Sequence, residues 1–416
     1  MAEKSSPSLN ERLVFRSITL AFIAVWIGTV ALEAVRHQWI VDNRGRPLPT
    51  DFLEVWVAGK FALQGAVAAP YDWKLHHAAQ IAVMGHPFSG YLGWLYPPIF
   101  LLVAAVLALL PYSWAFVLWV AGTCALYAPV IGRIARTGWA AILALASPAA
   151  LGTVLAGQNG FLSGALIGAT LLFLETRPLV AGLFLGLLTY KPQLGLLFPF
   201  VLLVGRQWKC LASASVTAAL CILIPYLLFG AAPFAALLHF LPQTNSTVLA
   251  SGRAGWNKLQ TVYGLVKSIG GSNVLAWQLQ AASAFAAACA IAWLWRTRHA
   301  SFALKAAALS AGILAATPYL YLYDLPILAV SLAFLFRDRA FDRLEWIGIA
   351  SVALALLSYL VVMLPVGPLL LLIIAAMIVR RVHESELAPP WAPKSGTDEI
   401  YPLPLDTRDL KLPLQQ

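Results

Sequence analysis

Charged side chains are scarce in this sequence of 416 residues. Asp, Glu, Lys and Arg together make up 11% of it, whereas 60% of the residues are hydrophobic and the mean hydropathy is +0.78. Soluble domains carry about 25% charged residues, so the composition excludes an ordinary soluble protein. A bilayer core needs about 20 apolar residues per helical span, and such stretches recur from Arg12 to Arg381. We therefore expect an all-α, polytopic transmembrane helical bundle, since lipid offers backbone groups no other partners.

Residues that could hold a metal or form disulfides are also few. The four cysteines lie in or beside apolar segments without metal-ligand spacing, as expected of small packing residues: Cys124, Cys210, Cys221 and Cys289. His76, His77 and His86 have no acidic cluster near them, and their spacing fits no standard zinc site. We predict that no metal or other cofactor is needed.

The net charge of +10 does not indicate nucleic-acid binding, because most Lys and Arg residues stand in short clusters between apolar runs. Lys4, Arg12 and Arg16 precede an uncleaved first span that reaches about Val35, which places the N-terminus in the cytoplasm. The later basic clusters are each separated by enough chain for a helical hairpin: Arg133/Arg136, Arg177, Arg206/Lys209, Arg296/Arg298, Arg337/Arg339/Arg343 and Arg380/Arg381.

The turns between these clusters should then face outward: Gly157 to Gly160, Lys191 to Gln193, a long loop from Pro242 to Lys258, Thr317 to Asp324, and Pro365 to Pro368. Segment 97–110 would break this alternation if it crossed fully, so we expect it to be re-entrant or partly inserted. Counting the helices between these turns predicts about 12 spans in the plasma (inner) membrane, with both termini in the cytoplasm. Residues 1–383 form the membrane domain, and 384–416, rich in Pro and charge, are expected to be a disordered cytoplasmic tail.

The first outer loop, residues 36–95, is the longest polar stretch before the tail. Asp51 to Leu63 is predicted to be a helix that begins with the start pattern Asp-x-x-Glu of Asp51 and Glu54. Its apolar stripe of Phe52, Val55, Trp56 and Leu63 predicts an amphipathic helix lying along the membrane surface. A second short helix is expected from Leu75 to Met84. The two surface helices would form a roof over a site.

Several short motifs follow one another in a recognisable order: Asp51-Phe52, the turn from Gly65 to Asp72, Tyr96-Pro97-Pro98, Gly157-Gln158-Asn159, Lys191-Pro192-Gln193, and Thr317-Pro318 leading to Tyr323-Asp324. In this order the sequence resembles glycosyltransferase family 87 of the GT-C superfamily. Its best-known members are polyprenyl-phosphomannose-dependent alpha-mannosyltransferases. The resemblance implies a GT-C fold and places a catalytic acidic residue at Asp51.

Sugar transfer from a lipid phosphate needs a carboxylate to accept the proton of the acceptor hydroxyl, plus cations to hold the phosphate. Asp51 is our candidate general base, with helix capping as the alternative. Outer-side cations are sparse, so Lys191, Arg253 and Lys258 are candidate phosphate ligands. Lys191 could instead be a lysine whose side chain reaches to water at the membrane surface. Arg253 and Lys258 could instead be ordinary charged residues of a loop.

Candidate contacts to the sugar or the acceptor are polar or aromatic residues of the outer turns: Glu54, Tyr96, Gln158, Asn159, Gln193, Tyr323 and Asp324. Asp324 has two alternatives, a pairing with Lys191 or another structural partner within the bundle. Gln158 and Asn159 have the alternative of a polar helix cap.

The predicted function is inverting transfer of a hexose, mannose by the resemblance, from a polyprenyl-phosphate donor to a lipid or glycan acceptor on the periplasmic or exterior side. The partners are therefore the donor, the acceptor and the bilayer, without nucleic acid. The main alternative is a secondary transporter or flippase, which would also have broken helices. Transporters usually contain internal repeats, and we find none here. A non-catalytic scaffold would give no reason for Asp51, Lys191 and Asp324 to lie on one side.

Overall fold

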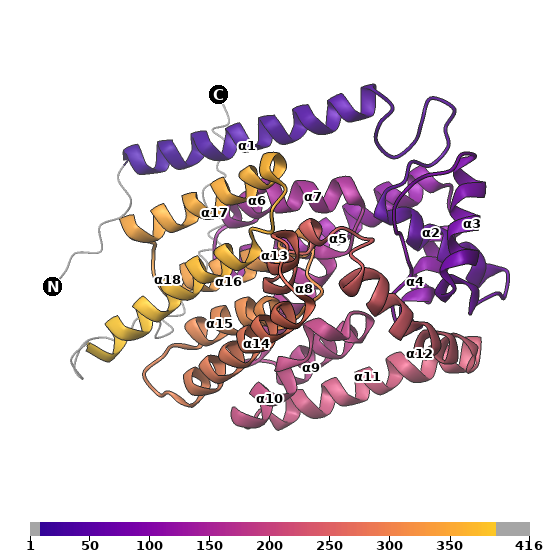
Figure 1. Cartoon of the computed structure of the whole chain (residues 1–416). Coiled ribbons are helices and arrows are strands. Elements are labelled where there is room, and N and C mark those ends of the chain that lie inside the picture. The colour runs from indigo at the N-terminus through magenta and orange to yellow at the C-terminus, as the bar shows by residue number, and fades with distance from the viewer. Residues whose placement is uncertain (1–8, 388–416) are drawn as a thin grey trace, which may run out of the picture.

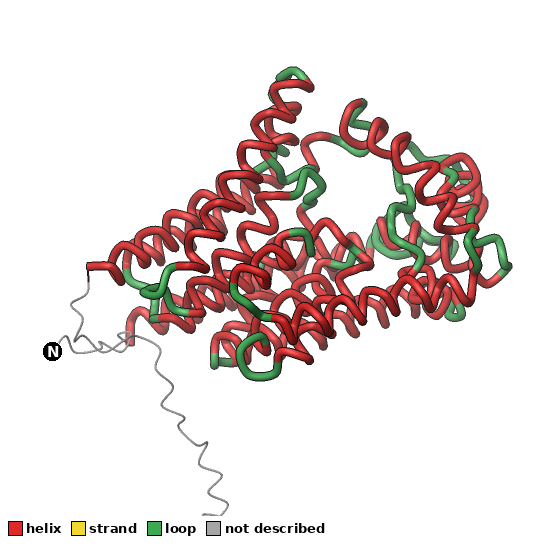
Figure 2. The backbone as a smooth tube through the Cα atoms, turned by 90° about the horizontal axis from the view of Figure 1, so that it is seen from below, coloured by secondary structure: helices red, strands yellow, loops and turns green. Residues whose placement is uncertain are grey.

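The computed structural model describes residues 9–387, and this part of the chain is helical without strands. Figure 1 shows an elongated bundle whose long helices run roughly along one axis, and Figure 2 shows helices throughout, joined by loops. The prediction of an all-helical fold is confirmed. Residues 388–416 of the expected tail lie outside the described residues, as do Met1 to Ser8 with Lys4.

The N-terminal half of the bundle contains α1 to α9. Their bounds are α1 Leu9–Val35, α2 Asp51–Leu63, α3 Trp73–Met84, α4 Ile99–Ala108, α5 Tyr112–Ala135, α6 Gly138–Ala146, α7 Pro148–Ala156, α8 Gly160–Phe173 and α9 Pro178–Leu187. Three short 3-10 turns accompany them: η1 Ala69–Tyr71, η2 Leu188–Tyr190 and η3 Pro192–Leu194.

The C-terminal half contains α10 Leu197–Val204, α11 Trp208–Phe229, α12 Ala232–Asn245, α13 Val262–Ser268, α14 Asn273–Arg296, α15 Phe302–Ala316, α16 Ile327–Asp338, α17 Arg343–Val362 and α18 Gly367–Leu387. Between them lie η4 Ser246–Ala250, a π-helical turn, and the 3-10 turns η5 Trp256–Lys258 and η6 Leu322–Asp324. Helix α18 continues past residue 383, so the last helix of the membrane domain extends into the start of the predicted tail.

Three helices of the described chain, α5, α11 and α14, are long and apolar enough to cross a membrane, with α6 and α7 as a fourth span if the bent pair is counted as one. Ser147 caps α7 at the 62° bend, its hydroxyl accepting from Ala150 N at 3.2 Å. Other apolar helices are shorter, among them α8, which spans Gly160–Phe173. The membrane character is supported, whereas the count of about 12 spans is not confirmed. Segment 97–110 contains only the short helix α4.

The first outer loop differs from the prediction in one respect. Helix α2 has the predicted bounds, and α3 starts at Trp73, slightly earlier than expected. However, α2 is buried on most of its sides, whereas Leu63 of the predicted stripe is 48% exposed. Gly59 explains the burial, because a Cβ at this position would lie 2.0 Å from the carbonyl oxygen of Ala104 in α4. The amphipathic pattern is thus wrong for α2, which packs into the bundle, and its place along the membrane surface stays a prediction.

The loop predicted from Pro242 to Lys258 is also more regular than expected. Pro242 lies inside α12, and η4 and η5 follow it. The Trp256 indole donates to Leu249 O at 2.7 Å, and the Tyr263 hydroxyl donates to the same carbonyl oxygen at 3.0 Å. These hydrogen bonds give the segment a fixed shape that composition did not reveal.

The basic clusters lie together at one end of the bundle, which we call the basic end. Arg16 stands over the Trp139 ring at 5.4 Å, which brings the start of α1 to the start of α6. Ser301, before α15, donates to Asp338 at the end of α16 with a distance of 2.5 Å. The predicted outer turns contact one another at the opposite end. Gln260, for example, donates to Leu320 O at 2.7 Å and accepts from Val366 N at 2.9 Å.

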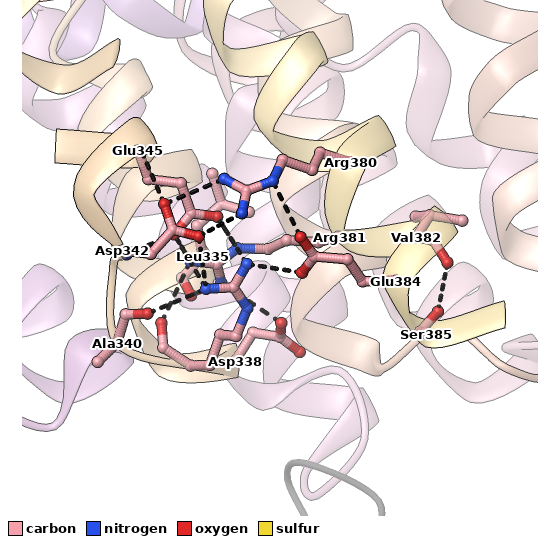
Figure 3. A network of polar contacts seen from close by, with 11 residues as sticks. Leu335, Asp338, Ala340, Asp342, Glu345, Arg380, Arg381, Val382, Glu384 and Ser385 are labelled. Atoms are coloured by element: carbon pink, nitrogen blue, oxygen red, sulfur yellow. Dashed lines mark hydrogen bonds and ion pairs between the residues drawn. The ribbon is translucent and has the colours of Figure 1, made fainter. Parts of the chain in front are cut away.

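A buried ion network joins three helices at the basic end (Figure 3). Arg381 of α18 forms two hydrogen bonds to Glu345 of α17, at 2.6 and 2.8 Å, and also donates to Leu335 O of α16. Arg381 is 2% and Glu345 1% exposed. Arg380 pairs with Asp342 and Glu384 farther out, at 2.6 and 2.9 Å. A bidentate pair such as Arg381 and Glu345 fixes the geometry of the helices that carry it.

We expect Arg381→Ala to lower the free energy of unfolding by about 3 kcal/mol, because it leaves the Glu345 carboxylate buried with one partner fewer. The matched control is Arg380→Ala, whose side chain is 37% exposed, with an expected loss of about 0–1 kcal/mol. Thermal unfolding of the detergent-purified proteins measures both. Equal losses of stability in the two variants would contradict the assignment of the larger contribution to the buried Arg381.

Candidate functional site

Five segments that are far apart in the sequence meet at the end opposite the basic clusters. Asp51 and Glu54 open α2, Gln158 and Asn159 form the turn from α7 to α8, and Lys191 joins η2 to η3. Asp324 closes η6, and Tyr96 precedes α4. All of these residues except the partly exposed Asp51 are buried. Most of the predicted site residues therefore gather in one place.

Glycine allows the turn at Gly157 to Gly160. Gly157 ends α7 with a φ of +66°, a conformation that side chains rarely adopt. Gly160 begins α8, where a Cβ would lie 1.7 Å from the carbonyl oxygen of Tyr323. The same oxygen accepts a hydrogen bond from Thr153 of α7 at 3.0 Å. The turn and η6 can therefore lie against each other, which brings Asn159 close to Asp324.

The two carboxyl groups of α2 share one amide. Gln158 Nε2 donates to Asp51 Oδ2 and to Glu54 Oε1, both at 3.3 Å. The N-cap of α2 is Thr50, whose hydroxyl lies 2.8 Å from that of Tyr112 and does not cap the helix. Capping therefore does not account for Asp51. The Asp-x-x-Glu pattern marks the helix start, and its two carboxyl groups bind Gln158.

A second polar group surrounds Lys191. Its ammonium group donates to Asn159 Oδ1 at 3.0 Å and forms an ion pair with Asp324, whose other oxygen accepts from Tyr321 N at 3.1 Å. The Tyr323 ring centroid lies 5.3 Å from the ammonium nitrogen. Lys191 is 6% and Asp324 0% exposed. The pairing of Asp324 with Lys191 is thus present, and the alternative of a lysine reaching to water is wrong.

Tyr96 links the two polar groups. Its hydroxyl donates to Gln158 Oε1 at 3.0 Å and accepts from Asn159 Nδ2 at 2.7 Å. Tyr190 was not among the predicted residues, although its hydroxyl lies 2.6 Å from Ser163 Oγ and contacts Asn159 O at 3.5 Å. Its neighbour Lys191 was the only indication in the sequence, and nothing distinguished this tyrosine from an anchor at the membrane interface.

The two carboxyl groups differ in how strongly they hold a proton. Burial raises the pKa of Asp51, while Lys258, the hydrogen bond from Gln158 and the charge of Lys191 act in the opposite direction. Burial also raises the pKa of Glu54, well above its ordinary value, and the neighbouring Asp51 charge raises it further. Of the two carboxyl groups, Asp51 therefore gives up its proton more readily than Glu54, as when two carboxyls in one site are driven apart.

Three predicted residues stay outside this hydrogen-bonded network. Gln193 in η3 is partly exposed, and Arg253 and Lys258 are exposed. Lys258 nevertheless acts on the Asp51 carboxyl through its charge. Among residues 9–387 no group of three or more His, Cys, Asp or Glu side chains could hold a metal ion.

The family model of glycosyltransferase family 87 matches residues 94–320, more than half of the chain. The chain belongs to this family. The protein is therefore a membrane glycosyltransferase, with a sugar donor and an acceptor as its partners. The matched range includes Tyr96, the Gln158-Asn159 turn and Lys191, whereas Asp51 precedes it and Asp324 follows it. No curated protein and no solved structure matches this chain.

We expect Lys191→Met to lower the free energy of unfolding by about 3–5 kcal/mol, because the buried Asp324 carboxylate loses its ion pair. The double variant Lys191→Met/Asp324→Asn should be more stable than the single one, since the amide keeps an acceptor for Tyr321 N without a charge. Thermal unfolding of the purified proteins tests both. A single variant as stable as the wild type would contradict the assigned pairing.

Proposed function

We propose that this glycosyltransferase transfers a hexose, namely mannose, from a polyprenyl-phosphate donor to a hydroxyl group of a lipid or glycan acceptor. The transfer inverts the configuration at the anomeric carbon. The observation that supports this proposal is the carboxyl pair of the partly exposed Asp51 and the buried Glu54, held by one amide in a member of glycosyltransferase family 87. A secondary transporter or flippase has no comparable support, because the family is one of transferases.

Asp51 is the proposed general base. Its carboxylate takes the proton of the acceptor hydroxyl as that oxygen bonds to the anomeric carbon from the face opposite the phosphate. The bond from the anomeric carbon to the phosphate oxygen breaks, and its electron pair leaves with the phosphate. Because a phosphate leaves as a stable anion, this reaction needs no acid at the leaving group, unlike glycoside hydrolysis. One ionised carboxylate is therefore enough.

Glu54 has a different proposed role. A protonated carboxyl group can donate a hydrogen bond, which an ionised one cannot. With its pKa raised well above the ordinary value by burial and by Asp51, Glu54 is the carboxyl group of the pair that keeps its proton more readily, and it would donate to a sugar or acceptor hydroxyl. The adjacent carboxyl groups thus divide two tasks, proton removal and orientation.

The donor phosphate would be held by Arg253 and Lys258, whose side chains are exposed next to the ordered segment of η4 and η5. Lys258 is close enough for its charge to oppose the rise that burial causes in the pKa of Asp51, which supports a place beside the reacting groups. Lys191 is less suited to this role than predicted, because its ammonium group is already bound to Asn159 and Asp324. Gln193 and the Tyr323 ring remain candidates for contacts to the sugar.

We place the site on the periplasmic or exterior side of the plasma membrane. The basic clusters lie at the other end of the bundle, and clusters of Lys and Arg near the membrane mark the cytoplasmic side. This orientation supports a donor presented from the outer leaflet. The GT-C architecture with about 12 spans belongs to the same proposal.

We expect Asp51→Asn to reduce transfer by at least about 100-fold, since the amide keeps the shape of the side chain but cannot accept a proton. The control is Asp42→Asn, an acidic residue of the same loop that pairs with Arg46 at 2.8 Å and lies outside the network. Transfer of labelled sugar from polyprenyl phosphate in nanodiscs measures both. Activity of the wild-type order in Asp51→Asn removes this residue from the mechanism, and a wild type that transfers from no polyprenyl donor rejects the donor class.

Single cysteines test the orientation in a background without Cys124, Cys210, Cys221 and Cys289. Arg44→Cys, in the exposed first loop, should react with a membrane-impermeant maleimide added to intact cells. His299→Cys, exposed between α14 and α15 at the basic end, should react only after permeabilisation. The reverse pattern would place the site in the cytoplasm.

A further inference from the structure

The polar groups of the site form a single chain of hydrogen bonds whose ends differ chemically. At one end stands the ammonium group of Lys191, which can only donate, and at the other the carboxylate of Asp51, which as the proposed base can only accept. Between them lie Asn159, Tyr96 and Gln158, each of which can do both. The four links measure 3.0, 2.7, 3.0 and 3.3 Å.

The donor end sets the direction of every link. Because Lys191 donates to Asn159 Oδ1, the amide nitrogen of Asn159 faces Tyr96 and donates to its hydroxyl. That hydroxyl then gives its own proton to Gln158 Oε1, which also accepts from Asn159 N at 3.2 Å. The amide nitrogen of Gln158 is left facing the two carboxyl groups.

The reverse direction is blocked at both ends. Turning the Asn159 amide would set its nitrogen against the Lys191 ammonium group, two donors without an acceptor. Turning the Gln158 amide would set its oxygen against the Asp51 carboxylate, two acceptors, and its nitrogen against Asn159 N, two donors. An unmatched buried polar contact costs about 1–3 kcal/mol, so a reversed chain would be rare.

We infer that Lys191 and Asn159 act through Tyr96 and Gln158 as positioning residues, which hold the Gln158 amide in the one orientation that donates to Asp51. This inference rests on the proposed role of Asp51 as the base. It gives Tyr96, Gln158 and Asn159 a task other than the predicted contact to sugar. It also gives the buried Lys191 a task that does not require contact with phosphate.

Tyr96 is the link that can be removed without changing a charge. Tyr96→Phe deletes one hydroxyl and keeps the ring, which packs against Trp94, Phe100 and Tyr190. Tyr190→Phe is the matched control. Tyr190 is 4% exposed, as buried as Tyr96 at 7%. Its hydroxyl bonds to Ser163 and to the backbone oxygen of Asn159, neither of which is a link of the chain to Asp51.

The titratable groups that act on the Asp51 carboxyl stay in place in both variants, apart from the deleted hydroxyl. They are Glu54, Lys191, Lys258, Asp324, Tyr112, Tyr321 and Tyr323, with His76 packed near the backbone of Glu54. The tyrosines are uncharged in the acid range in which a carboxyl group titrates. A change in Tyr96→Phe would therefore report the lost link.

The experiment is an infrared pH titration of the carboxyl bands in the purified protein, which needs no substrate. The band absent from Asp51→Asn is assigned to Asp51. In Tyr96→Phe its midpoint should move up by about one pH unit, because the Gln158 oxygen keeps only its bond from Asn159 N, and the amide, held less firmly, stabilises the carboxylate less. In Tyr190→Phe it should stay at the wild-type value. An unchanged midpoint in Tyr96→Phe, or an equal rise in both variants, would overturn the inference.

A second variant and a transfer assay test the same inference independently. If Tyr96→Phe does not fold, Asn159→Leu breaks the same chain without a change of charge and should also raise the midpoint, whereas an unchanged midpoint would count against the inference. In transfer assays the acid limb of the kcat profile should move up with the infrared midpoint, while the KM for the donor stays at the wild-type value. A shifted infrared midpoint in a protein whose Asp51→Asn variant is fully active would reject the proposed function and leave the hydrogen-bond chain in place.

Discussion

The site depends on the ion pair between Lys191 and Asp324. An ammonium group and a carboxylate buried in protein are both costly unless each has a partner, and here each is the other's partner. The pair joins the η2–η3 junction to η6, two segments separated by 133 positions. Asn159 then connects this pair to the Gln158 turn. The convergence of the outer turns follows from satisfying two charges that water cannot reach.

The ion network at the basic end lies at the other end of the bundle from the Lys191–Asp324 pair, and it fixes helices rather than the site itself. Asp324 lies before α16 and Asp338 ends it, so the length of this one helix separates the two polar regions. Arg381 and Glu345 hold α17 and α18 to the far end of α16. The helix is thus fixed at both ends, which keeps η6 and its carboxylate from moving away from Lys191.

The sequence predicted local structure better than it predicted contacts. Helix α2 has the bounds expected from its start pattern, because that pattern is encoded within a few residues. The stripe through Leu63 was wrong, because the burial of α2 depends on Gly59 meeting Ala104, which lies on another helix. The bond from Gln158 to Asp51 spans 107 positions. No single sequence reveals such a pairing, so the family resemblance alone could single out Asp51.

The same distinction explains why the chemical roles of the polar residues were harder to predict than their identity. Lys191, Asn159 and Gln158 stood out as polar groups at helix ends, where contact with a ligand was the natural hypothesis. In the folded chain their donors and acceptors are largely used by one another, whereas Asp51 keeps part of its surface exposed. Groups already oriented by the fold need no rearrangement when charge develops in the reaction. A site built in this way presents one prepared carboxylate to the acceptor, and the residues behind it set its orientation and its proton affinity.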